Sequence, residues 1–236
     1  MTKKMAYVTD IHLDEEFPAS VGVDTRKNWQ VILEDISSRG IRDIIFGGDI
    51  GEEKANPWFF DQLKNYTVDL SLGNHDNFNT VKKYYTAHQN VRKSALYYRR
   101  EFPFHTAIFL DSSTEIVQEE QLEWLQTAIQ TSKPIIIFVH HPILPVNVIM
   151  DKRYALKGRE RIRTALLAIP NKVTLFCGHY HLKDVQQDKN IHQYITPASS
   201  YQVTKSQDEI NVNTDSFGYR ILEFKEEELH TNLIMF

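Results

Sequence analysis

Residues 70–77 read LSLGNHDN, an apolar run that breaks into glycine, amide, imidazole and carboxylate at consecutive positions. The apolar part is typical of a strand buried on both faces. A polar turn would explain the rest, because Asn and Asp both favour turns. However, Asn74, His75 and Asp76 are also residue types that bind metal ions or transfer protons. If other strands end in the same way, a shared site becomes the better explanation.

The same kind of apolar run recurs along the chain and alternates with helical patterns. The other runs are MAYVT (5–9), DIIFG (43–47), PIIIFVH (134–140) and KVTLFCG (172–178). Apolar residues at helical spacing predict helices over 24–39, before Gly40, and over 118–129. Alternating strands and helices predict the α/β class. Strand-like runs without helices follow at 192–200, 217–224 and 228–236, so we expect a second sheet or an antiparallel edge to close one domain over residues 1–236.

Composition restricts the classes of protein that remain possible. The chain has 27 Lys and Arg against 31 Asp and Glu, a net charge of -4, which argues against long nucleic acid as a partner. The basic stretch at 157–163 is expected to be a solvated helix face. One cysteine, Cys177, excludes an internal disulfide and a thiolate cluster. No stretch reaches the about 20 apolar residues of a membrane span. We therefore expect a cytoplasmic protein without membrane contact, and the oligomeric state stays open.

Each of the five apolar runs is followed by side chains that can ligate a metal. These side chains are Asp10, His12, Asp49, Asn74, His75, Asp76, His140, His141, His179 and His181. Taken singly, a carboxylate after a strand is more often a helix cap or a turn residue. Taken together they predict a site, because loops converge at the carboxyl ends of strands in open α/β sheets. Their nitrogen and oxygen donors suit Mn, Fe or Zn.

The order of these motifs resembles that of the calcineurin-like metallophosphoesterase family. The motifs are D-x-H (10–12), G-D (48–49), G-N-H-D (73–76), H-H-P (140–142) and G-H-x-H (178–181). QLEWLQ (121–126) is similar to a helix of the branch containing class III cyclic-nucleotide and glycerophosphodiester phosphodiesterases. The resemblance covers about residues 6 to 182. It implies a four-layer α/β/β/α sandwich of two mixed β-sheets.

The resemblance also implies a dinuclear centre of two divalent or trivalent metal ions with a metal-bound hydroxide. The implied ligands are Asp10, His12, Asp49 and His181 for the first metal, and Asp49, Asn74, His140 and His179 for the second. Asp49 would bridge the two ions. Family patterns favour His140 over His141, which would take a neighbouring role.

The resemblance places His75 beside the metals without ligating them. An imidazole there can stabilise the transition state or protonate the departing oxygen, and Asp76 could orient it through its other nitrogen. We therefore take His75 and Asp76 as the candidate catalytic residues. Simple packing is the alternative role for His75.

The substrate is expected to be a small phosphoester. Related protein phosphatases carry an arginine where this chain has Glu53, and an acid there repels a phosphate dianion more than a monoanion. This favours a small-molecule phosphodiesterase of the cyclic-nucleotide or glycerophosphodiester type. A phosphomonoesterase is the main alternative, and a nuclease or a non-catalytic interaction module of the same fold are the others.

Overall fold

The structure is a computed structural model that describes residues 3–85 and 94–236. Its helices are α1 (Glu16–Ser20), α2 (Thr25–Ser38), the 3-10 turn η1 (Glu53–Ala55), α3 (Asn56–Gln62), α4 (Phe78–Val81), α5 (Glu119–Ala128), α6 (Ile149–Tyr154) and α7 (Arg159–Leu167). Its strands are β1 (Lys3–Val8), β2 (Asp43–Phe46), β3 (Thr67–Leu70), β4 (Tyr98–Glu101), β5 (Thr106–Phe109), β6 (Ile135–Phe138), β7 (Val173–Cys177), β8 (Asp184–Asp188), β9 (Ile191–Ile195), β10 (Gln202–Val203), β11 (Val212–Asn213), β12 (Gly218–Lys225) and β13 (Glu228–Met235).

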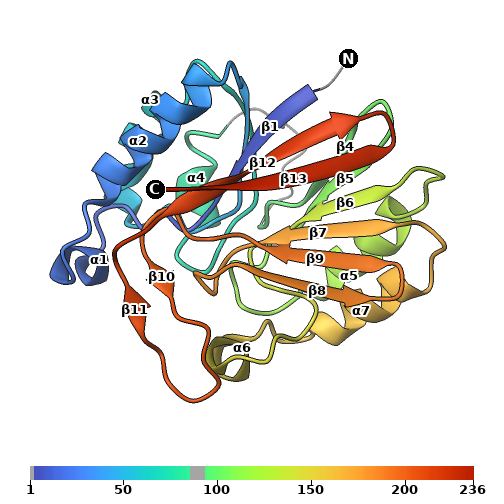
Figure 1. The fold of residues 1–236 in the computed structure, drawn as a ribbon. Coiled ribbons are helices and arrows are strands. Elements are labelled where there is room, and N and C mark those ends of the chain that lie inside the picture. The colour runs from blue at the N-terminus through green and yellow to red at the C-terminus, as the bar shows by residue number, and fades with distance from the viewer. Residues whose placement is uncertain (1–2, 86–93) are drawn as a thin grey trace.

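Two mixed sheets pack face to face, with helices on their outer faces (Figure 1). The first sheet has the order β13-β12-β1-β2-β3, in which β1, β2 and β3 are parallel and β12 and β13 add an antiparallel edge. The second has the order β4-β5-β6-β7-β9-β8, with parallel strands in the centre and antiparallel β4 and β8 outside. The expected fold class is therefore confirmed.

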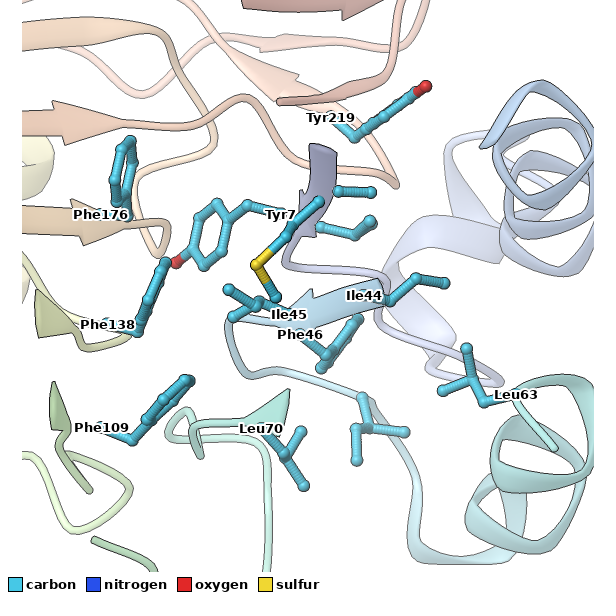
Figure 2. Packing of buried hydrophobic residues seen from close by; sticks show 14 of the residues in the cluster. Tyr7, Ile44, Ile45, Phe46, Leu63, Leu70, Phe109, Phe138, Phe176 and Tyr219 are labelled. Carbon is cyan, nitrogen blue, oxygen red and sulfur yellow. The ribbon is translucent and has the colours of Figure 1, made fainter. Parts of the chain in front are cut away.

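The strands of the second sheet show why their apolar runs lack alternation. Ile136 and Phe138 of β6 face the first sheet, whereas Ile135 and Ile137 pack in the cluster that contains residues of α5 and α7. Both faces of the strand are therefore buried, as in parallel sheets covered on each side. Between the sheets, Phe138 stacks on Phe176 with ring centroids 5.6 Å apart (Figure 2).

The predicted helix over 24–39 is α2, which buries Trp29, Ile32 and Ile36 against the first sheet. Asp24 caps it by accepting a hydrogen bond from Lys27 N at 3.0 Å, and Gly40 follows its end with a φ of 68°. None of the helices within 3–85 and 94–236 is long and apolar enough to cross a membrane.

The basic stretch 157–163 enters α7, where its arginines pair with carboxylates. Arg161 bonds Glu119 at 2.7 Å, and Arg163 bonds Asp188 at 2.7 Å. Arg159 points inward and bonds Asp151 at 2.9 Å. Paired arginines of this kind form a solvated helix face and leave little positive charge free for a nucleic-acid backbone.

Candidate metal centre

The carboxyl ends of five parallel strands, three from the first sheet and two from the second, meet at one edge of the sandwich. Backbone bonds hold the loops together: Asp10 N donates to Gly48 O at 3.0 Å, and Gly178 N donates to His140 O at 3.0 Å. His179 N, from the second sheet, donates to Asp10 Oδ1 at 3.0 Å. The two sheets thus deliver their polar loops to a single place.

Asp10, His12 and His181 form one group of candidate ligands. Their donor atoms lie within 4.8 Å of one another, and all three residues are buried. The Nε2 atoms of His12 and His181 are 3.0 Å apart, and His181 Nε2 is 3.4 Å from Asp10 Oδ1. Two imidazole nitrogens facing each other beside a carboxylate form a donor set that a cation can occupy.

Asp49 lies between this group and His140. Its Oδ2 is 3.5 Å from His12 Nε2 and 3.1 Å from His140 Nε2, while its Oδ1 accepts a hydrogen bond from His75 N at 2.9 Å. One carboxylate oxygen is therefore tied to the backbone and the other faces imidazoles of both expected metal sites. This is the placement that a bridging ligand needs.

Four of the histidines share a feature typical of metal ligands, in which the second ring nitrogen is held by an acceptor. The pairs are His12 Nδ1 with Glu15 Oε2 (3.0 Å), His140 Nδ1 with Gly47 O (2.9 Å), His179 Nε2 with Tyr154 O (3.0 Å) and His181 Nδ1 with Tyr201 O (3.0 Å). Backbone carbonyls and an ionised carboxylate only accept, so each of these bonds places the proton on the named nitrogen and leaves the other free to ligate.

Two buried polar atoms at the centre support the fit of a metal. In the part of the chain that the structure describes, His140 Nε2 and Asn74 Oδ1 make no hydrogen bond, although both are shielded from solvent. A buried donor or acceptor without a partner costs about 1–3 kcal/mol. A cation would satisfy both atoms, so the residues present fit the expected metal centre.

His141 lies beside His179, with ring centroids 3.9 Å apart, and its donor atom groups with those of His140 and His179. Its Nδ1 is 2.8 Å from Ser112 Oγ, a hydroxyl that can donate or accept. His140 is the one whose free nitrogen lies against Asp49. The geometry thus favours His140 as the ligand and leaves His141 as its neighbour.

Electrostatics keep two of the imidazoles neutral and therefore able to ligate. Burial, with the nearby His140, lowers the pKa of His179 to about 3. Burial and His12 hold the pKa of His181 well below its usual value. Burial raises the pKa of the Asp49 carboxyl, but His140 and other imidazoles outweigh it and hold that pKa well below its ordinary range.

His75 is oriented by Glu15, a residue that sequence reasoning did not single out. Its Nδ1 is 3.0 Å from Glu15 Oε1, and this hydrogen bond raises the pKa of His75 to about 9. The other oxygen of Glu15 holds His12, as described above. The sequence LDEEF (13–17) has three acidic residues after His12, and no local sequence signal indicates which of them bonds to the histidines.

Asp76 has a different role from the expected one. Its Oδ2 accepts from Asp49 N at 2.8 Å and from Gly73 N at 2.9 Å, and its Oδ1 accepts from Ile50 N at 2.8 Å. Within the described residues, no bond joins it to His75. Asp76 therefore ties the loop of Asp49 to the loop of Asn74. The structure does not support the prediction that Asp76 orients His75, because the residue that bonds the His75 ring is Glu15.

The segment 199–201 holds the loops of the candidate ligands in place through hydrogen bonds. The sequence motifs do not indicate this contribution. Ser200 donates to Asp10 O through its amide at 3.1 Å and its hydroxyl at 2.7 Å, and Ser199 holds Thr9 O in the same way. The Tyr201 carbonyl then fixes His181. The side-chain bonds of Ser199 and Ser200 join residues 190 positions apart, and the motif for Asp10 and His12 does not reveal them.

A cavity of about 290 Å³ opens above the centre. Its polar lining residues are His12, Asp49, Asn74, His75, His179 and His181. Its other lining residues are Phe17, Met150, Tyr154, Tyr201, Val203, Ile210 and Val212. Neither set contains a lysine or an arginine. A second cavity, of about 520 Å³, shares Asn74 and His75 with the first and is lined by Glu15, Glu16, Glu52 and Glu53.

Comparison with known proteins agrees with this geometry. Residues 3–183 match the family model described as calcineurin-like phosphoesterase. A protein of Fibrobacter succinogenes named "Probable cyclic nucleotide phosphodiesterase" is 25% identical over 237 residues, which cover 98% of this chain and 93% of the relative. The 3',5'-cyclic adenosine monophosphate phosphodiesterase CpdA of Escherichia coli K12 is 25% identical over 238 residues, which cover 93% of this chain and 84% of CpdA.

Among solved structures, a dimetal phosphatase from Danio rerio superposes with a TM-score of 0.65 at 12% identity, and 98% of each chain is covered. At this level of identity the likeness concerns the fold alone. The fold and the ordered motifs therefore agree with each other, and the two curated relatives are similar over most of their own length.

Proposed function

We propose that this chain, which belongs to the calcineurin-like phosphoesterase family, hydrolyses small phosphodiesters and has a 3',5'-cyclic nucleotide as its substrate. As a member of that family it is a metal-dependent phosphoesterase. The finer proposal is supported by one observation above the others: among residues 3–85 and 94–236, no lysine or arginine lines the cavity that joins the ligand set to His75. The names of the curated relatives point to the same substrate class.

The proposed ligands are Asp10, His12, Asp49 and His181 for one metal ion, and Asp49, Asn74, His140 and His179 for the other. Two such ions would supply Lewis acidity toward phosphoryl oxygens and would lower the pKa of a bound water. The nitrogen and oxygen donors suit Mn, Fe or Zn. With two carboxylates among the ligands, the centre keeps net positive charge for an anionic ester.

His75 is proposed as the group that protonates the oxygen leaving phosphorus. It is partly exposed to both cavities, and its Nδ1 is occupied by Glu15, so Nε2 is the nitrogen that can face a substrate. When the ester P–O bond breaks, a proton from Nε2 neutralises the departing alkoxide. Glu15 keeps the ring in this orientation and favours its protonated form.

The charge around the site favours a diester over a monoester. A monoester dianion carries more negative charge than a diester monoanion, and the described residues that line the two cavities include four glutamates but no lysine or arginine. Glu53, expected from the sequence to disfavour a dianion, lines the second cavity beside His75.

The proposal is tested by hydrolysis after metal-free protein is reconstituted with Mn²⁺ or Zn²⁺. We expect bis-p-nitrophenyl phosphate to turn over faster than p-nitrophenyl phosphate, and cyclic AMP faster than glycerophosphocholine. Faster turnover of the monoester would replace the proposal with a phosphatase. No hydrolysis of any of them by protein with two bound metals would favour a non-catalytic module.

Two variants separate the ligand from the acid. Asp49→Asn should lose activity together with bound metal, because it removes the anionic bridge, whereas His75→Ala should lose most activity and keep the metal. Metal content is measured by plasma mass spectrometry, and His230→Ala, an exposed histidine on β13, serves as the matched control. Equal loss of metal in the Asp49 and His75 variants would contradict the role given to His75.

A further inference from the structure

The cavity above the metal centre is lined by two chemically different sets of residues. Besides the candidate ligands, its lining includes Phe17, Tyr154, Tyr201, Ile210 and Val212, which we name the aromatic subsite. These residues come from α1, α6 and the segment 201–213, which lie far apart in the sequence but line the same cavity. A ligand that fills the cavity must therefore combine an anionic end with an apolar one.

The subsite leaves large apolar side chains open to solvent. Phe17, Tyr154 and Val212 are 46%, 48% and 36% exposed, and all three line this one cavity. Scattered exposed apolar residues are common, but a group that converges on a polar centre marks a binding surface. The Phe17 ring contacts the Tyr201 ring edge to face, with centroids 5.3 Å apart, so flat surfaces are already present.

Backbone hydrogen bonds hold the hairpin that forms part of the subsite in a fixed position. The hairpin β10–β11 pairs Val203 with Val212, and both of these line the cavity. Val203 N donates to His181 O at 2.7 Å, which joins the hairpin to a candidate ligand. In the loop between β10 and β11, Ser206 O accepts a hydrogen bond from Ile149 N of α6 at 2.7 Å. The apolar lining therefore has a fixed position relative to the metal centre, as preorganised binding requires.

We propose that the aromatic subsite receives the planar base of the substrate by stacking and apolar contact. This inference rests on the proposed function, because the phosphoester must sit at the metal centre. The volume of about 290 Å³ is near the lower end of small-molecule sites, which matches a mononucleotide. Among the described residues of the aromatic subsite, Tyr154 and Tyr201 contribute the polar side-chain atoms, their phenol hydroxyls.

Selectivity follows from this chemistry. Stacking on apolar and aromatic side chains accepts any flat base, whereas discrimination between bases needs hydrogen-bonding groups aimed at the base edge. Cyclic AMP and cyclic GMP should therefore be used with similar kcat/KM. An aliphatic phosphodiester such as glycerophosphocholine has no planar group and gains nothing from the subsite.

The test uses variants that change the subsite and leave the ligands intact. Val212→Asp places a charge on the apolar wall, and Phe17→Ala removes one flat surface; both positions are partly exposed, so the fold should hold. Glu209→Ala is the matched control, since this exposed residue is on the same hairpin loop and does not line the cavity. Melting temperatures of all variants are compared first.

For Mn²⁺-loaded protein we expect Val212→Asp and Phe17→Ala to raise the KM for cyclic AMP and cyclic GMP by about tenfold, which is the scale of one lost stacking contact. The kcat and the rate with glycerophosphocholine should stay near the wild-type values. An equal rise in KM for the aliphatic ester, or no rise for the nucleotides, would overturn the subsite.

A binding measurement separates failure of the subsite from failure of the proposed function. Titration of AMP into the Mn²⁺-loaded protein by calorimetry should show about tenfold weaker binding for Val212→Asp. Suppose that the wild type hydrolyses no cyclic nucleotide but Val212→Asp still lowers the affinity for AMP. The subsite would then be supported, and the proposed function would be contradicted. If cyclic AMP is hydrolysed and the variant changes neither KM nor AMP affinity, the function holds and the subsite fails.

Discussion

Five of the seven candidate ligands have a left-handed backbone. They are Asp10, His12, Asp49, His179 and His181, with φ values of 57°, 51°, 61°, 69° and 51°. A residue with a Cβ in this region costs about 1 kcal/mol or more, and such strain persists only where surrounding bonds over-determine it. Here Ser199, Ser200 and Asp76 supply those bonds. The concentration of strain at these residues is itself a mark of a functional site.

At the same scale, Glu15 gives a prediction about His75. Glu15→Gln keeps the size of the side chain but removes the charge that both imidazoles face. We expect kcat to fall by about tenfold or more, with KM for substrate and bound Mn²⁺ unchanged at saturating metal. Steady-state kinetics and metal analysis check this.

Glu16→Gln is the control for Glu15, because Glu16 is the exposed neighbour on the same turn. A variant of Glu15 that loses metal as fully as Asp49→Asn would show that Glu15 acts through His12 alone. Unchanged kcat would remove Glu15 from the mechanism altogether.

At the scale of elements, the strands deliver ligands because small residues let their loops touch. Gly178 follows β7, and a Cβ there would overlap with Asp10 Oδ2 and Thr9 Oγ1 of the loop after β1. Gly73 follows β3, and its Cβ would overlap with Asp49 Oδ1. These two glycines serve close approach rather than a special backbone angle, since neither has a positive φ. A side chain at either position pushes a candidate ligand out of place.

Gly178→Ala is therefore expected to reduce bound Mn²⁺ and activity by at least tenfold. The contrasting variant is Gly158→Ala, where φ is 81° and a Cβ would meet open space. That change should cost about 1 kcal/mol of unfolding free energy through backbone strain and leave metal binding intact. Metal analysis and chemical denaturation distinguish the two. Full metal content in Gly178→Ala would show that the loops can separate without losing the site.

At the scale of the whole molecule, the two sheets share a core that includes residues from both ends of the chain. Tyr7 of β1 packs on Phe138 and Phe176 of the second sheet, with centroids 5.6 and 5.9 Å apart (Figure 2). The C-terminal strand pair β12–β13 returns to the first sheet beside β1. Because neither sheet can bury its inner face without the other, we predict that residues 1–236 unfold as one unit.

Scanning calorimetry checks this prediction, which requires the calorimetric and van't Hoff enthalpies to agree. Phe138→Ala should lower the unfolding free energy by about 3–5 kcal/mol and keep a single transition. Val185→Ala, at a position that is 56% exposed on β8, should change it by less than about 0.5 kcal/mol. Two separate transitions, with only one affected by Phe138→Ala, would divide the chain into two domains.

The strands with apolar runs, the helix α2 and the set of candidate ligands could be predicted from the sequence because their signals are local, whereas β4, β5 and β8 were not predicted. Apolar runs such as 134–140 mark doubly buried strands, and the motif at 73–76 follows its strand directly. Family resemblance then ordered these pieces into two sheets. Both faces of β6 are buried, so its sequence is a continuous apolar run rather than an alternation of apolar and polar residues. This burial is why such strands can be recognised from the sequence.

Only the tertiary structure decided which side chains support the site and what surrounds it. Glu15 rather than Asp76 faces His75, Ser200 holds the loop of Asp10 from 190 residues away, and the hairpin β10–β11 forms an apolar wall beside His181. A hydrogen bond or a cavity wall depends on where two distant segments meet. That meeting is set by the packing of the two sheets, so the sequence by itself determined the candidate ligands and their order along the chain, and the sandwich determined their partners.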